Sequence, residues 1–201
     1  MDFLSAIKSI AGEECIFCNE MMSDHTTFKV GGPAKYFVVP YRAEDIKKYI
    51  LAAEEYKIPY YVIGNGSNLL VSDKGYDGMI IMLGRDLGNI TVNGDRITAE
   101  AGTSLARLFN TARRHSLSGL EFAAGIPGTL GGACYMNAGA YGGEMKDVLT
   151  KVVTIDRQGN THEYKQGEME LSYRNSIFIR KQEIIPVSYT HLRAHETVLD
   201  L

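Results

Sequence analysis

Cysteine, proline and tryptophan are scarce in this chain: its 201 residues include three cysteines, five prolines and no tryptophan. An odd and small number of cysteines is typical of a reducing compartment rather than of a disulfide framework. Cys15 and Cys18 do form a Cys-x-x-Cys pair. No second pair with metal-ligand spacing follows it, so we predict two ordinary thiols on an N-terminal helix.

Excess positive charge and long apolar runs are also missing. The formal net charge is -3 and the isoelectric point is about 6.0, which offers no basic surface for nucleic acid or an anionic membrane. No apolar stretch approaches the roughly 20 residues of a membrane span, and the acid-containing N-terminus has no signal-peptide core. We therefore expect a cytoplasmic protein that binds neither nucleic acid nor membrane, and that holds any phosphate with backbone and local dipoles.

Histidine and nucleophile motifs give no catalytic centre. The histidines are scattered, without an HExxH or a paired Cys/His spacing, so no metal site is predicted. No GxSxG motif is present either. His25 precedes a glycine and proline cluster, where we interpret it as a polar loop residue within possible reach of a ligand. The five histidines are His25, His115, His162, His191 and His195.

The first part of the chain, residues 1–83, has the pattern of a small mixed lobe. One or two amphipathic helices are expected up to about Met22. The following segments predict a strand, a helix, and two further strands, because apolar positions recur first at strand and then at helical spacing. Their bounds are Ala34 to Pro40, Ala43 to Lys57, Tyr60 to Gly64 and Gly78 to Leu83.

Residues 84–186 predict a second, α+β lobe. Alternating residues from Ile90 to Glu100 around Asn93-Gly94 indicate a hairpin, and Val152 to Lys165 indicate another. Between them, Thr103 is placed to cap a helix. The apolar face of that helix contains Leu105, Leu108, Phe109 and Ala112. Two hairpins that flank a helical and glycine-rich centre favour an α+β arrangement.

The chain is organised around Glu121 to Glu144, which contains seven of the 21 glycines. Pro127-Gly128 predicts a turn, Thr129 a helix N-cap, and Leu130 to Met136 a short helix that ends near Asn137. A helix start exposes N–H groups and the positive end of its dipole, so this start is a natural anion site. A tight turn packed for its own sake is the alternative that this stretch alone leaves open.

A second glycine loop runs from Ile63 to Gly75. Gly64-Asn65-Gly66-Ser67-Asn68 lacks the third glycine of a Rossmann fingerprint and the Gly-Lys-Ser/Thr of a P-loop. Its backbone N–H groups and the Ser67 and Asn68 side chains can still donate to a diphosphate, although such pairs also mark ordinary turns. With one glycine loop in each lobe, we predict a dinucleotide clamped between them.

Arg174 lies in Leu171 to Phe178, between an aromatic residue and a polar pair. Its planar guanidinium is suited to hold a carboxylate or to stabilise a developing enolate oxygen. A surface arginine paired with a nearby acid is the alternative.

Five segments, taken together and in this order, closely resemble the UDP-N-acetylenolpyruvoylglucosamine reductases. They are FKVGGPAKYFVVP, IGNGSNLLVSDKGYDGMII, EAGTSLARLF, GLEFAAGIPGTLGGACYMNAGAYGGE and LSYRNSIF, and the resemblance runs from about Thr26 to Pro186. It implies an α+β, two-lobed FAD-binding fold of the PCMH type, shared with the vanillyl-alcohol oxidase group, with FAD held non-covalently between the lobes. In that family NADPH reduces the flavin, which passes hydride to the enolpyruvyl carbon of the UDP-sugar. This step belongs to peptidoglycan synthesis and so to cell wall biogenesis, cell shape and cell division.

The resemblance also assigns roles to residues. Two glycine segments match the family's flavin-binding loops, and Arg174 matches the catalytic arginine, which is thought to polarise the enolpyruvyl group. The first loop is Gly64, Asn65, Gly66, Ser67 and Asn68; the second is Gly125, Ile126, Pro127, Gly128, Thr129, Gly131, Gly132, Asn137 and Gly139.

The chain departs from the family at its end. Family members continue into a third, substrate-binding domain with a serine proton donor and a glutamate, and neither has a counterpart here. Residues 187–201, VSYTHLRAHETVLDL, are similar to a translated adapter or vector junction, so we expect a non-native tail. Without the positioning that the third domain supplies, we expect weak or no FAD binding, negligible turnover and poor solubility.

Two other functions stay open from the residues alone. One is an oxygen-using oxidase of the same fold, which often tethers its flavin covalently. The loop Gly64 to Asn68 offers no histidine or cysteine for a tether, although His25 and Cys134 remain as attachment points. The other is a non-catalytic nucleotide-binding module, in which Arg174 would be dispensable.

Overall fold

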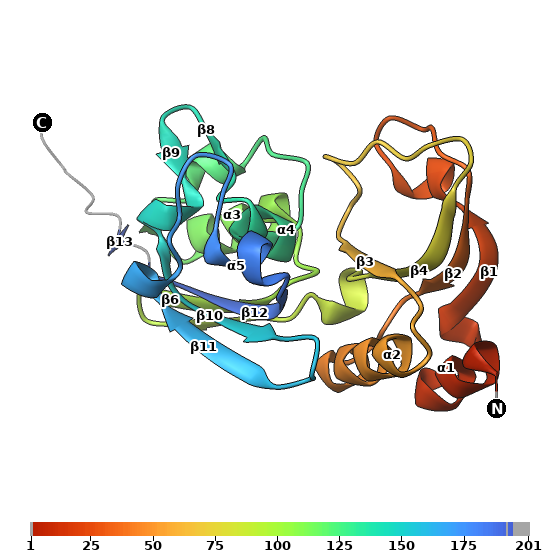
Figure 1. Cartoon of the computed structure of the whole chain (residues 1–201). Coiled ribbons are helices and arrows are strands. Elements are labelled where there is room, and N and C mark those ends of the chain that lie inside the picture. The colour runs from red at the N-terminus through yellow and green to blue at the C-terminus, as the bar shows by residue number, and fades with distance from the viewer. Residues whose placement is uncertain (1, 192, 195–201) are drawn as a thin grey trace, which may run out of the picture.

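Strands of the first 82 residues form one sheet and those after residue 89 form another, as seen in a computed structural model that describes residues 2–191 and 193–194 (Figure 1). The first sheet has the order β1-β2-β4-β3, and the second has the order β11-β10-β12-β6-β5. Two short two-stranded ribbons complete the described strands. No helix among the described residues is long and apolar enough to cross a membrane.

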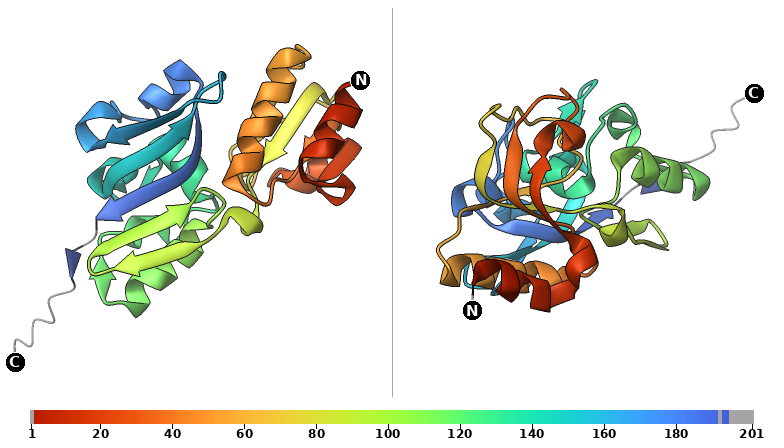
Figure 2. Two further views of the ribbon diagram at one scale, coloured as in Figure 1. Left: turned by 90° about the horizontal axis from the view of Figure 1, so that it is seen from below. Right: turned by 90° about the vertical axis from the view of Figure 1, so that its right-hand side faces the viewer.

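The first sheet is mixed. β2 (Pro33–Val38) and β3 (Tyr60–Ile63) both pair parallel with β4 (Tyr76–Met82), and β1 (Ile16–Met21) adds antiparallel to β2. Helices α1 (Phe3–Ala11) and α2 (Ala43–Glu55) lie next to one another and share a core with this sheet (Figure 2). The predicted strands and the predicted helix of this lobe are confirmed. Their apolar residues are divided between this core and a second cluster that contains Ala34, Phe37, Ile63 and Ile80.

The predicted helical structure up to Met22 is wrong from Ile16 onward, after a short 3-10 helix over Glu13–Cys15. Gly12 ends α1 with φ of 90°, and the chain then enters β1, where Ile16 pairs with Val38 and Met21 with Pro33. Pairing with β2 thus overrides the helical pattern of this segment. Cys18 is therefore exposed on a strand and Cys15 is buried just before it, and both are free thiols.

The second sheet is antiparallel throughout its five strands. Both predicted hairpins are present, as β5 to β6 and β10 to β11, and Gly94 has the positive φ of 61° that its turn requires. Helices α3, α4 and α5 contribute to the core against this sheet (Figure 1). The bounds are β5 Ile90–Asn93, β6 Arg96–Glu100, α3 Leu105–Arg114, α4 Leu130–Tyr135, β10 Leu149–Ile155, β11 Thr161–Lys165, α5 Ile177–Lys181 and β12 Ile184–His191.

The start of α3 differs from the prediction by one residue. Ser104, and not Thr103, is the N-cap, and its hydroxyl accepts from the N–H of Arg107 at 3.3 Å. Thr103 is buried instead. The predicted apolar face holds for Leu105, Leu108 and Ala112, which are buried, while Phe109 is partly buried against the same core.

Strand β12 lies between β10 and β6 and contains the first part of the predicted tail. The backbone of residues 187–190 pairs with both neighbours, and that of residue 191 pairs with β6. Residues 192 and 195–201 of that tail lie outside the described residues.

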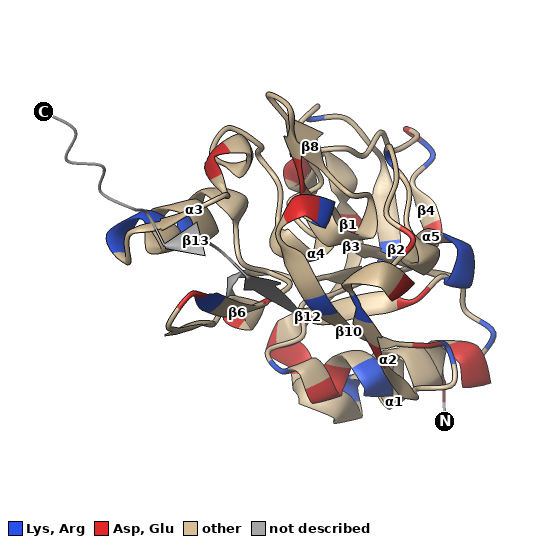
Figure 3. Cartoon of the chain, turned by 90° about the vertical axis from the view of Figure 1, so that its left-hand side faces the viewer, with Lys and Arg blue, Asp and Glu red and all other residues tan. Residues whose placement is uncertain are grey.

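The two sheets are joined at the helix-covered end of the first lobe. Ile155 and Ile184 of the second sheet belong to the same core as α1 and α2. Arg157, which follows β10, forms an ion pair of 3.6 Å with Glu54 of α2 and stacks 5.8 Å from the Tyr60 ring. Acidic and basic residues are interspersed over the elements in Figure 3, apart from the basic last turn of α3.

Candidate functional site

The first glycine loop leaves the end of β3 and touches the second lobe directly. A Cβ atom built on Gly64 would lie 2.1 Å from Oγ1 of Thr129 and 3.0 Å from its Cγ2. Such distances exclude any side chain at this position without displacement of one loop. Gly64 therefore allows the two glycine loops, one from each lobe, to come into contact.

The same loop packs against the turn that precedes β2. Gly66 has φ of 60°, and a Cβ atom there would lie 2.0 Å from the carbonyl oxygen of His25. The N–H of Thr27 donates to the carbonyl of Gly66 at 3.2 Å. The loops of residues 24–29 and 64–68 are therefore packed against one another at this edge of the first lobe.

Thr129 is the N-cap residue of α4, as predicted, but it does not cap the helix through its side chain. Its side chain makes no capping hydrogen bond, is buried, and lies against Gly64. The N–H groups of Leu130 and Gly131 donate to the carbonyls of Thr103 and Ala101 at 2.8 and 2.9 Å. These two helix-start donors are therefore occupied by the protein, and the predicted anion site at the start of α4 is smaller than the sequence suggested.

At Gly125 and Gly128 there is open space where a side chain would otherwise lie. No atom lies within 4 Å of a Cβ built on Gly125. For Gly128 the nearest atoms are 3.8 to 3.9 Å away and include Oγ of Ser67. The prediction that the two glycine loops face one another is therefore confirmed, with Ser67 opposite Gly128.

Asn137 ties three segments together at the end of α4. Its amide donates to Oε2 of Glu144 at 2.6 Å and to the carbonyl of Ser172 at 3.0 Å, and its oxygen accepts from the N–H of Lys146 at 2.9 Å. The residue is 2% exposed, and φ is 45°, a conformation that asparagine tolerates. Both amide donors are thus used within the protein, so we assign Asn137 an anchoring role.

Glu144, the partner of Asn137, lies on the ribbon formed by β8 (Gly139–Ala140) and β9 (Gly143–Glu144). The hydrogen bond from Lys146 lowers the pKa of Glu144, and the hydrogen bond from Asn137 lowers it by a smaller amount. Gly139 packs closely here, because a Cβ atom on it would lie 2.7 Å from the carbonyl of Gly143.

Arg174 stands at the tip of a tight turn. Ser172 and Asn175 exchange two backbone hydrogen bonds of 3.1 Å, and Arg174 between them has φ of 54°. Its guanidinium lies 5.9 Å from the centre of the exposed Tyr173 ring. No ion pair of Arg174 with an acid is found within the described part of the chain, so its donors face solvent.

The end of α4 brings the three predicted segments together. Nδ2 of Asn68 lies 3.5 Å from Sδ of Met136, on the side of the first glycine loop. The hydroxyl of Ser176 donates to the carbonyl of Tyr135 at 2.5 Å, next to the Arg174 turn. Burial raises the pKa of Tyr135. Residues far apart in sequence thus meet around one short helix.

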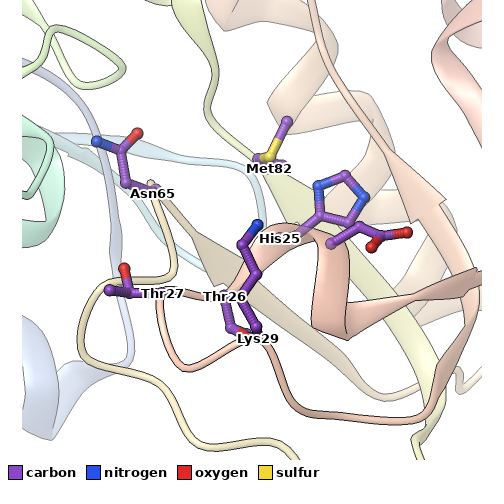
Figure 4. A pocket seen from close by; sticks show the side chains of 8 residues that line it. His25, Thr26, Thr27, Lys29, Asn65 and Met82 are labelled. Carbon is purple, nitrogen blue, oxygen red and sulfur yellow. The ribbon is translucent and has the colours of Figure 1, made fainter.

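A cavity of about 450 Å³ opens beside the first glycine loop (Figure 4). The volume lies within the range of about 300 to 1,000 Å³ typical of ligand sites. His25 is held at its edge, with its ring stacked 4.3 Å from that of Phe37 and Nε2 2.9 Å from Oε1 of Glu20. The lining residues are Asp24, His25, Thr26, Thr27, Lys29, Gly64, Asn65 and Met82. Sequence reasoning gave no role to Asp24, Thr27, Lys29 or Met82.

The chain belongs to the FAD-binding domain family, whose model matches residues 34–165. It is similar to UDP-N-acetylenolpyruvoylglucosamine reductases of several bacteria. The reductase of Syntrophomonas wolfei is 51% identical over 175 residues, which is 87% of this chain and 58% of the relative. That of Clostridium botulinum is 42% identical over 199 residues, 99% of this chain and 64% of the relative. The chain thus spans about three fifths of the length of these relatives.

Solved structures agree on the architecture. The crystal structure of the same reductase from Thermus caldophilus matches with a TM-score of 0.74 at 36% identity, and covers 88% of this chain and 62% of its own. The 4-ethylphenol oxidase from Gulosibacter chungangensis also gives 0.74, at 17% identity over 96% of this chain and 42% of its own, which indicates a shared fold. The predicted two-lobed, vanillyl-alcohol oxidase-like fold is confirmed.

The residues present fit a dinucleotide such as FAD. Gly125 and Gly128 give open backbone, Ser67 faces Gly128, and the cavity beside Asn65 carries further polar side chains. Backbone N–H groups and small polar side chains of this kind are suited to a diphosphate, because its oxygens must come close to the donors and large side chains would keep them apart. Among the described residues, no group of three or more His, Cys, Asp or Glu side chains is placed to hold a metal ion.

Proposed function

We propose that this chain is the FAD-binding part of a UDP-N-acetylenolpyruvoylglucosamine reductase and that its two glycine loops hold FAD non-covalently between the lobes. The observation that carries the proposal is the contact of Gly64 with Thr129 across the lobes. Both residues lie in segments that match the FAD-binding domain family.

In the proposed reaction, the cofactor supplies the hydride transfer and the protein positions and polarises the substrate. When bound, FAD would supply the hydride-transfer chemistry between NADPH and the enolpyruvyl group of the UDP-sugar, and the residues of the two glycine loops would hold it. Arg174 presents its guanidinium at the tip of the 172–175 turn, where it can donate to the carboxylate or developing enolate oxygen of that group. Asn137 positions this turn by holding the carbonyl of Ser172.

The proposed cellular setting is the cytoplasm, in peptidoglycan precursor synthesis and hence in cell shape and division. It is supported by the similarity to the reductases. Cysteines that are not joined in disulfides, as for Cys15, Cys18 and Cys134, also suit a reducing compartment.

A chimaera tests the proposal. Residues 2–186 would be joined to the C-terminal part of the Clostridium botulinum relative, with the junction at Pro186 because we propose that residues 187–201 are a non-native tail. We expect NADPH oxidation that depends on the enolpyruvyl UDP-sugar. Sugar-independent oxygen consumption, or yellow colour that stays on the denatured polypeptide, would instead identify an oxidase with tethered flavin.

The 201-residue chain on its own is expected to turn over negligibly. It spans only 58 to 64% of these relatives, and hydride transfer requires an acceptor held in place against the flavin. The measurement is NADPH absorbance at saturating sugar, compared with free FAD at equal concentration. Sugar-dependent oxidation well above that control would contradict this prediction.

The Arg174→Ala substitution is expected to leave FAD affinity and thermal stability nearly unchanged. Arg174 is exposed and its guanidinium lies over the Tyr173 ring, so the change in the free energy of unfolding is expected to stay within about 0.5 kcal/mol. Flavin fluorescence titration and thermal unfolding measure the two quantities. In the chimaera the same substitution should abolish most sugar-dependent turnover; retention of full turnover would remove Arg174 from the reaction.

A further inference from the structure

The cavity beside the first glycine loop contains a cation that the sequence did not assign. Lys29 lines this cavity together with Gly64 and Asn65. No ion pair of Lys29 is found within the described residues. An ammonium group that forms no ion pair, at the wall of a cavity of about 450 Å³, is available to a ligand anion.

The backbone of Lys29 is held in an uncommon conformation. Its φ is 55°, in the left-handed region that favours glycine or asparagine. The N–H of Lys29 donates to the carbonyl of Thr26 at 3.2 Å, and the buried Thr26 hydroxyl donates to the carbonyl of Val30 at 3.0 Å. The turn around Thr26 therefore imposes this strain, and residues held in such a conformation gather at ligand sites.

Two neutral polar groups share the cavity with Lys29. Figure 4 shows the Thr27 hydroxyl, the Lys29 ammonium and the Asn65 amide around the same space. Thr27 is fixed to the first glycine loop, because its N–H donates to the carbonyl of Gly66. The cavity thus combines one full positive charge with two side chains able to donate hydrogen bonds.

The cavity also has an acidic member, Asp24. His25, which adjoins it, is paired with Glu20 at 2.9 Å. A simple inorganic anion would meet repulsion from Asp24, whereas a nucleotide brings both phosphate oxygens and hydroxyl donors. The presence of both Asp24 and Lys29 in the cavity therefore favours a nucleotide over a free anion as the ligand.

We propose that Lys29, with Thr27 and Asn65, binds a phosphate of the FAD diphosphate. The inference rests on the proposed FAD binding and adds to it a side-chain charge, where the sequence predicted only backbone and dipoles. The positive charge of Lys29 compensates a diphosphate oxygen, while Gly64 and Gly66 let the backbone approach.

The test compares Lys29→Met and Lys29→Arg with the unaltered chain by flavin fluorescence titration, using FAD and riboflavin, which has no phosphate. Loss of one charge-assisted hydrogen bond is expected to weaken FAD binding by about tenfold or more in Lys29→Met, and the deficit should shrink at about 1 M salt. Riboflavin affinity should not change, and Lys29→Arg should keep most FAD affinity. Lys35→Met is the matched control, because Lys35 lies in the same lobe and pairs with Asp77 at 2.8 Å instead.

Each other outcome contradicts the inference. Equal FAD affinity in Lys29→Met and the unaltered chain would overturn it and leave the proposed function standing. Equal losses of FAD and riboflavin would indicate a merely structural role. UDP-N-acetylglucosamine would be titrated in parallel. If Lys29→Met lost affinity only for this compound, Lys29 would bind the sugar nucleotide and not FAD. Absence of FAD binding by the unaltered chain would contradict both the inference and the proposed function.

Discussion

The Gly64→Val substitution is expected to weaken FAD binding by about a hundredfold or more, which corresponds to roughly 2.7 kcal/mol. The first added carbon would lie 2.1 Å from Oγ1 of Thr129 and 3.1 Å from its Cβ. Rotation of Thr129 exchanges Oγ1 with Cγ2 but leaves Cβ in place, and the residue is buried. The two loops must therefore separate, and a ligand that both loops hold loses one side of its site.

Double substitution isolates this contact. Gly64→Ala should be less severe than Gly64→Val, and Gly64→Ala combined with Thr129→Ala should recover part of the lost affinity, because the atom nearest to the added carbon is removed. Gly167→Ala is the control, since nothing lies within 4 Å of its built Cβ. Fluorescence titration gives the dissociation constants. Wild-type affinity in Gly64→Val would show that the loops do not hold FAD jointly.

The Asn137→Asp substitution is expected to lower the free energy of unfolding by about 3 kcal/mol, which lowers the melting temperature by about 6 to 12 °C in a chain of this size. A carboxylate cannot donate to Oε2 of Glu144 or to the carbonyl of Ser172, which now lie 2.6 and 3.0 Å from the amide. It also places a second negative charge beside Glu144. The β8–β9 ribbon and the Arg174 turn lose their common anchor.

The stability difference between Asn137→Asp and the unaltered chain is expected to depend on pH. The lowered pKa of Glu144 contributes stability that is present above its ordinary value of 4.5 and is lost as pH falls through the folded value. In Asn137→Asp, acid protonates one of the two facing carboxyls and relieves their repulsion. The gap in stability between the two proteins should therefore narrow as pH falls from 7 toward about 4.

Thermal unfolding followed by circular dichroism measures this gap. Asn93→Asp is the matched control, because Asn93 is exposed in the β5–β6 hairpin, and it should stay within about 0.5 kcal/mol of the unaltered chain. An Asn137→Asp protein as stable as this control would contradict the anchoring role of Asn137.

Local signals predicted most of the fold. Asn93-Gly94 identifies its hairpin because the turn conformation is a property of those two residues, and the buried face of α2 follows from residues three and four apart. β1 was missed because it is an edge strand whose pairing with β2 begins 12 residues after it ends. Helical spacing within that segment carries no information about its partner strand.

The site was predictable in its loops but not in its contacts. Glycine density identified both loops, since residues without a Cβ atom let the backbone come close to a ligand or to another loop. The roles of Thr129 and Asn137 were not accessible, because Thr129 meets Gly64 and Asn137 meets Ser172, both distant in sequence. Lys29 was missed for the same reason: its significance lies in the cavity that it shares with Asn65.

Titration of the unaltered chain with FAD tests the central claim that two glycine loops, one from each lobe, hold one flavin dinucleotide. Of the weak or absent binding expected for a chain without the substrate domain, the account predicts weak binding, because both glycine loops lie within this chain: quenching of flavin fluorescence should saturate at one FAD per chain, and all flavin should separate from the polypeptide on denaturation. No saturable binding up to about 1 mM FAD, which corresponds to a binding free energy weaker than about -4 kcal/mol, would contradict it.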